Sequence, residues 1–157
     1  MDAIWTSAVA VAGTLLGSVV TYPFQRLASR QQRLNEERIV AYTAFATAVE
    51  AFRYGQAERF FRWQDDPGSE AYRAAYHEGH RLRSVAWQAF YRVQLIADDP
   101  QVVQLAGKAL ELTRDIGQAL GHNLPDGVAQ DKQHRTERNQ QAKDAIRAFV
   151  AHASKNL

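Results

Sequence analysis

The sequence predicts an all-α protein, in which an N-terminal transmembrane helix and a short stalk precede an antiparallel bundle of about four helices. Three observations predict this fold. An uncharged run occupies the start of the chain, apolar residues then recur every three or four positions, and breaks containing Gly or Pro separate the periodic stretches. No segment shows the alternation of apolar and polar residues that is typical of a half-buried strand.

The first predicted element is a membrane-spanning helix within residues 1–25. Between Asp2 and Arg26 the chain carries no Asp, Glu, Lys, Arg or His. A helix from Ala3 to Gln25 rises about 34 Å, and the hydrocarbon core of a bilayer is about 30 Å thick. A secretory signal peptide is one alternative, although basic residues do not precede the apolar run. A moderately apolar helix buried in a soluble partner is the other.

The charges on either side of the span predict its orientation. Arg26, Arg30 and Arg33 follow it, whereas the N-terminal side carries Asp2. The positive-inside rule then places the N-terminus outside and the C-terminal part in the cytoplasm, as a single-pass protein of the inner (cell) membrane. The three arginines are candidates for contact with anionic lipid head groups, at about 1 kcal/mol each. Residues 26–38 form the predicted juxtamembrane stalk.

Small residues on one side of the predicted span are candidates for an oligomer interface. Gly13 and Gly17 form a GxxxG pattern, and Ala10 and Thr21 extend it at roughly helical spacing. Small residues let two helix backbones approach closely in a membrane, which favours self-association. The alternative is that Gly and Ala are simply common in such helices.

Residues 39–157 are predicted to form the cytoplasmic helical bundle. Three stretches place apolar residues on one helix face, namely 42–63, 72–96 and 102–120. A fourth helix from Val128 onward is apolar only in its second half. Its first half, residues 131–141, is almost entirely polar and is predicted to be exposed or frayed.

Two similar breaks separate the first three bundle helices. Asp66-Pro67 and Asp99-Pro100 each place an acidic residue before a proline. Because Asp is a good N-cap and Pro suits the first helical position, each pair predicts the start of a helix. Capping therefore explains the carboxylate pairs without general acid–base catalysis.

The sequence contains one candidate metal site. His77 and His80 are three residues apart on a predicted helix and could share one ion. Their spacing is not that of HExxH, so a solvated pair is the favoured interpretation, and no metal or cofactor is expected. The chain has no cysteine, which excludes disulfides, thiol catalysis and Cys-based metal sites. We expect the protein not to be an enzyme.

Nucleic acid is an unlikely partner on charge grounds. Arginines alternate with aromatic residues in the first two bundle helices, yet the net charge is only +2 because glutamates are interspersed. The favoured interpretation is that arginine stems cover the edge of an aromatic core.

Several segments of the chain resemble a group of small single-pass membrane proteins of actinobacteria, usually labelled hypothetical. They are Gly-Thr-Leu-Leu-Gly-Ser-Val-Val-Thr-Tyr (13–22), an Arg/Gln-rich stalk, Tyr-Thr-Ala-Phe (42–45) and Tyr-Arg-Val-Gln-Leu-Ile-Ala-Asp-Asp-Pro (91–100). The resemblance implies an N-terminal anchor with a helical cytoplasmic domain, and implies no activity.

The sequence thus predicts a membrane-anchored helical interaction or scaffolding module that binds a protein partner or a second copy of itself. The alternative is a membrane-perturbing or phage- or plasmid-related accessory protein whose anchor is the active part.

Overall fold

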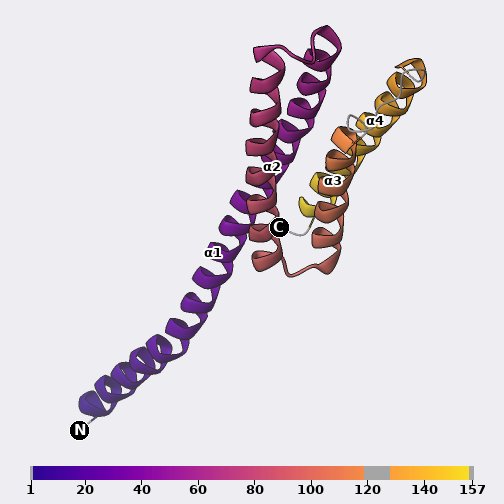
Figure 1. Cartoon of the computed structure of the whole chain (residues 1–157). Helices are drawn as coiled ribbons and strands as arrows, with labels where there is room; N and C mark the ends of the chain where they lie inside the picture. Colours follow the sequence, from indigo (N-terminus) through magenta and orange to yellow (C-terminus); the bar gives the residue numbers. More distant parts are fainter. Residues whose placement is uncertain (1, 119–127, 156–157) are drawn as a thin grey trace. The chain divides into compact units, whose positions relative to one another are not determined.

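The computed structural model describes the backbone of residues 2–118 and 128–155 and the side chains of residues 30–117 and 134–155. Over these residues the chain is helical without strands, as predicted, and its four helices are α1 (Asp2–Asp65), α2 (Glu70–Ile96), α3 (Pro100–Gln118) and α4 (Val128–Ala153). The chain divides into two compact units, Met1–Glu37 and Arg38–Leu157. The second unit holds the bundle (Figure 1).

In the first unit the described side chains begin at Arg30. Gln32 donates a hydrogen bond of 3.1 Å to Glu36, one helical turn further on. Among the residues whose side chains the structure describes, no helix is both long enough and apolar enough to cross a bilayer. The predicted span within residues 1–25 lies outside the described side chains, so it stays a prediction.

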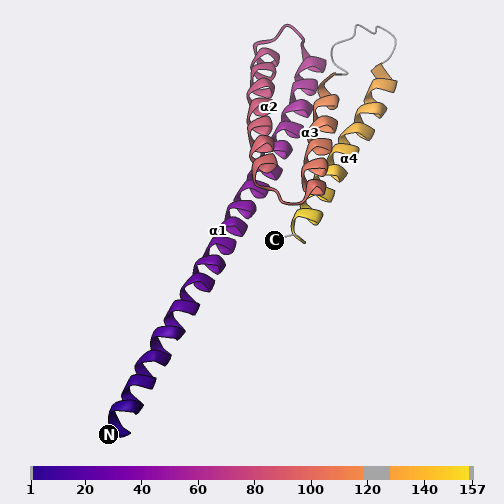
Figure 2. The same cartoon turned by 90° about the horizontal axis from the view of Figure 1, so that it is seen from below.

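The second unit consists of two helical pairs packed around one core. Residues 38–65 of α1 lie beside α2, and α3 lies beside α4, in both views (Figures 1 and 2). The Phe45 ring lies 4.9 Å from the Phe149 ring of α4 and 6.1 Å from the Phe90 ring of α2, centroid to centroid. Leu110 of α3 belongs to the same buried cluster. All four helices therefore contribute to one core.

The predicted periodicity of the bundle helices is confirmed. In α1 the residues at steps of three and four are buried: Tyr42, Phe45, Val49, Phe52, Gln56 and Phe60. Buried members of the predicted faces also occur in α2 (Ala86, Phe90, Val93), α3 (Val102, Ala106, Leu110) and α4 (Ala142, Ile146, Phe149). Burial of these faces is the main favourable term for the bundle.

The predicted N-cap at Asp66 is wrong, because α2 begins later. Ser69 caps α2, and its Oγ accepts a hydrogen bond of 3.0 Å from the N–H of Tyr72. Asp66 instead accepts a hydrogen bond of 2.8 Å at Oδ1 from the N–H of Gly68, which closes the turn before the helix. Ser69 is therefore the N-cap of α2, because its hydroxyl accepts from an N–H of the first turn, whereas the Asp66 carboxylate is used within the preceding turn.

The matching prediction at Asp99 is confirmed. Pro100 is the first residue of α3, and Asp99 Oδ1 accepts a hydrogen bond of 2.8 Å from the N–H of Gln101. The short turns after α1 and after α2 make consecutive helices antiparallel.

The prediction that the first half of α4 is exposed or frayed is wrong for two of its described side chains. Arg135 is only 7% exposed, and its guanidinium lies over the ring of Phe60. Asn139 accepts a hydrogen bond of 2.6 Å at Oδ1 from Nη1 of Arg53, a buried residue of α1. Polar contacts with α1 hold this part of α4 where apolar residues are absent from the sequence.

Candidate functional site

An apolar surface on α1 faces solvent at the start of the bundle. The side chains of Ile39 and Val40 are 47% and 54% exposed, and Thr43, Ala44 and Thr47 are also exposed. We call these five residues the α1 face. No charged residue occurs between Ile39 and Val49. Exposed apolar patches without charge are typical of interaction surfaces.

A groove between α1 and α2 borders the α1 face on one side. Its volume is about 700 Å³. Its lining residues are mostly apolar or small: Ile39, Val40, Thr43, Ala44, Thr47, Ala48 and Ala51 from α1, with Arg81, Leu82 and Val85 from α2. We call it the α1–α2 groove. Its apolar lining suits a helix or an extended apolar segment better than a small polar substrate.

A second, smaller groove borders the α1 face on the α4 side. Its volume is about 240 Å³, and it is lined by Ile39, Tyr42, Thr43, Ala46, Thr47, Phe149, Val150, Ala153 and Ser154. Val150 is half-exposed at its edge. The α1 face therefore contributes to the lining of two apolar depressions.

The charges at the rim of this surface are paired within the chain. Arg81, which lines the α1–α2 groove, donates hydrogen bonds of 2.7 and 2.6 Å to the carboxylate of Glu78. On the α4 side, Arg53 donates hydrogen bonds of 3.0 and 2.7 Å to Glu50. The hydrogen bond from Arg53, supported by the nearby positive charges of α4, holds the pKa of Glu50 below its usual value. Because Arg81 and Arg53 already have carboxylate partners within the chain, this surface does not favour a charged ligand.

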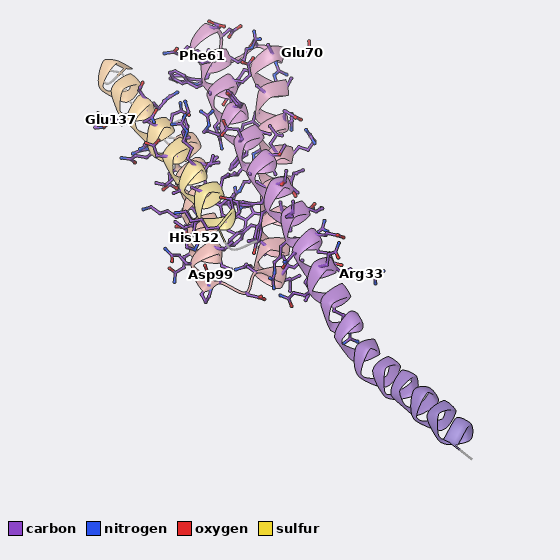
Figure 3. The ribbon with its side chains drawn as sticks, turned by 180° about the vertical axis from the view of Figure 1, so that it is seen from behind. Arg33, Phe61, Glu70, Asp99, Glu137 and His152 are labelled. Carbon is purple, nitrogen blue, oxygen red and sulfur yellow. The ribbon has the colours of Figure 1, made fainter. Side chains whose placement is uncertain are left out.

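A polar cluster fixes the α1 face relative to the turn between α2 and α3. Arg38 is buried, forms an ion pair with Asp98, and donates a hydrogen bond of 3.1 Å from Nε to the carbonyl of Ile96. Nε2 of His152 lies 2.6 Å from Oδ2 of Asp99. Figure 3 shows His152 and Asp99 together, at the opposite end of the bundle from Phe61 and Glu70.

The electrostatics of this cluster fit a structural role. The hydrogen bond from His152, with that from the backbone of Gln101, holds the pKa of Asp99 below its usual value. Burial raises the pKa of the neighbouring Tyr42 hydroxyl, and the nearby Arg38 opposes that shift. Of this acidic pair in the sequence, Asp98 thus forms a salt bridge and Asp99 caps α3.

The structure does not bring the predicted metal candidates into a site. His77 and His80 are both exposed, and the rings of His80 and Tyr76 lie 4.6 Å apart, centroid to centroid. Glu78, the carboxylate between them in sequence, is bonded to Arg81. Among the described residues no group of three or more His, Cys, Asp or Glu side chains could hold a metal ion.

The other predicted site residues lie near the N-terminus. Ala10, Gly13, Gly17 and Thr21 lie outside the described side chains, and so does Arg26. Arg30 and Arg33 are exposed, which leaves them accessible to a ligand, and Arg33 is labelled in Figure 3. The predicted oligomer interface and head-group contacts stay predictions.

A comparison with protein families matches residues 39–157 to the family described as KilB plasmid transfer protein. The match covers well over half of the chain. The chain belongs to the KilB plasmid transfer protein family. No curated protein and no solved structure matches it. The part matched to KilB begins at Ile39, the first residue of the α1 face, and includes both grooves beside it.

The apolar periodicity of this KilB family member predicts the buried side of α1, which includes Tyr42, Phe45 and Val49, and does not predict the exposed surface on the opposite side of the same helix. The signal was present, because a helix with one buried face normally carries charged residues on the other. Residues 39–49 carry none.

Proposed function

We propose that this protein is an accessory factor of plasmid transfer that works as a membrane-anchored helical interaction module without catalysis of its own. The family match over residues 39–157 carries the proposal, because it spans the whole helical bundle. In this view the bundle lies on the cytoplasmic side of the inner membrane and presents the α1 face to a protein. The resemblance to actinobacterial membrane proteins is part of the same proposal.

Two further observations support this function. The uncharged run from Ala3 to Gln25, followed by Arg26, Arg30 and Arg33, has the length and flanking charge of a single-pass anchor. The apolar α1 face and the α1–α2 groove have the composition of a protein-binding surface. An interaction module needs only these two parts, a tether and a surface.

A mating assay tests the proposal. We expect deletion of the gene in a plasmid-bearing donor strain to lower the frequency of plasmid transfer, and expression of the full chain to restore it. Membrane fractionation of the donor cells should recover the chain with the inner membrane. Unchanged transfer after deletion would contradict the role in transfer, whereas recovery in the soluble fraction would contradict the anchor.

A second candidate function is that the anchor itself is the active part and perturbs the membrane. The GxxxG pattern of Gly13 and Gly17 favours it, because it suits self-association of the span. Replacing residues 3–25 with an unrelated single-pass span of the same orientation separates the two candidates. An interaction module should keep transfer after the replacement. A membrane-perturbing anchor should lose both transfer and any leakage of a small fluorescent dye.

A further inference from the structure

The α1 face differs from the exposed sides of the other three helices. Those sides carry charged residues at intervals: Arg73, Arg83 and Arg92 in α2, Lys108 and Glu111 in α3, and Glu137, Asp144 and Arg147 in α4. Residues 39–49 of α1 expose Ile39 and Val40 and no charge. Depletion of charge combined with exposed aliphatic side chains is the composition of an interface core and not of a solvated helix.

We propose that the α1 face and the α1–α2 groove bind the same surface of a second copy of this chain, which forms a symmetric dimer through α1 and α2. The proposal rests on the proposed function in that it names the partner of the interaction module. In such a two-fold interface the same patch occurs on both sides. The α1 face of each copy would pack against the α1–α2 groove of the other.

The charge pattern of the groove favours a second copy as its occupant. Arg81 is the one charged residue among the described residues that line the groove. Its guanidinium already donates two hydrogen bonds to the carboxylate of Glu78. A charged occupant would therefore be desolvated without a counter-charge. An uncharged helix face fits the groove better. The chain itself exposes such a face, because Ile39, Val40, Thr43, Ala44 and Thr47 are exposed and uncharged.

The side chains that line the groove also favour a second helix. The lining includes the short side chains of Ala44, Ala48 and Ala51 from α1, with Leu82 and Val85 from α2. Val85 is partly exposed and would become buried in the dimer. Short alanine side chains let a second helix approach to an interaxial distance of about 8 Å.

The area of the surface predicts the strength of the dimer. The α1 lining of the groove extends over residues 39–51, or about 20 Å of helix, and the α1 face with the groove is about two helix widths, or about 20 Å, across. Each copy would then bury about 400 Å², or about 800 Å² in total, below the 1,200–2,000 Å² of most stable complexes. The dimer should be weak between free molecules and well populated when copies are concentrated by a common membrane.

Cysteine cross-linking in membranes tests the proposal on the full chain. Since the protein has no cysteine, each variant carries a single thiol. Thr43→Cys and Thr47→Cys place it on the α1 face, and Gln104→Cys places it on the exposed side of α3 as a matched control. After mild oxidation of the membranes we expect a disulfide-linked band of twice the chain mass for the first two variants. The control should give at least about tenfold less.

A second substitution separates this surface from other causes of association. Ala44→Glu, made in the Thr43→Cys chain, places a charge at an exposed position and should abolish the dimer band without unfolding the bundle. Gln104→Glu in the same chain should leave the band unchanged. If Ala44→Glu leaves the band intact while Gly13→Leu removes it, the anchor carries the association and the proposal is overturned.

Three other outcomes would also overturn the proposal: monomer at both α1-face positions, equal dimer at Gln104→Cys, or a cross-linked product whose mass includes a different protein. These results are independent of the mating assay. Loss of transfer with no dimer band contradicts the dimer alone, and a dimer band with unchanged transfer contradicts the proposed function alone.

Discussion

Truncation of Phe45 to alanine should be among the most damaging single changes in the bundle. Its side chain is fully buried. Its ring packs edge-on against Phe149, with the centroids 4.9 Å apart, and lies tilted against Phe90, with the centroids 6.1 Å apart. Loss of a buried phenylalanine costs about 3–5 kcal/mol, and two aromatic partners place Phe45 in the middle of that range or above it. We expect Phe45→Ala to lower the free energy of unfolding by about 4 kcal/mol.

Urea unfolding of the full chain in mild detergent, followed by the helical circular dichroism signal, measures this loss. With a slope of about 2 kcal/mol per molar urea, the midpoint should fall by about 2 M. Phe61→Ala is the matched control, because Phe61 lies on the same helix but is 58% exposed. It should shift the midpoint by less than about 0.5 M. Equal shifts for the two variants would refute the position of Phe45 at the centre of the core.

The remaining predictions concern a glycine pair, a buried hydrogen bond and an acid dependence. Gly79→Ala should stabilise the bundle by about 0.5–1 kcal/mol, since an added Cβ meets nothing within 4 Å. Gly117→Ala should destabilise the bundle, because its Cβ would collide with the buried side-chain amide of Gln56 in α1. Asn139→Ala should cost about 1–2 kcal/mol through loss of its bond to a buried arginine, and Gln140→Ala only a few tenths. Urea midpoints check these four variants, and equal shifts within either pair would contradict the assigned contacts. Because the pKa of Glu50 is lowered from its usual value of 4.5 in the folded protein, its contribution is present above pH 4.5 and lost as the pH falls through the lowered value. Glu50→Gln should therefore flatten the fall in melting temperature below pH 4.5, and a parallel fall in both proteins would contradict this contribution.

Local patterns in the sequence predicted most of the bundle. The steps of three and four from Tyr42 to Phe60 identified the buried side of α1, since that periodicity follows directly from helix geometry. Asp99-Pro100 identified the start of α3 for the same kind of local reason. Asp66-Pro67 gave a wrong prediction for the start of α2. Two possible caps, Asp66 and Ser69, lie three residues apart, and the path of the turn decides between them.

Contacts between distant segments could not be predicted in this way. The bond from Arg53 to Asn139 joins residues 86 positions apart, and no periodicity in the polar first half of α4 indicates it. The α1 face was open to prediction from its missing charges, but the α1–α2 groove beside it was not. A groove depends on how far apart two helices pack, which their separate sequences do not state.

The polar cluster of Arg38, Asp98, Asp99 and His152 also has a mechanical consequence. It joins the entry of α1 into the bundle, the turn before α3 and the last turn of α4 at one end of the unit. A pull applied between residues 38 and 154 would act directly on these contacts and break them one after another. A pull applied between residue 38 and the turn at residues 66–69 would instead act along the axis of one continuous helix, whose backbone hydrogen bonds carry the load together. The bundle would therefore resist tension best when the force is applied at the turn between α1 and α2.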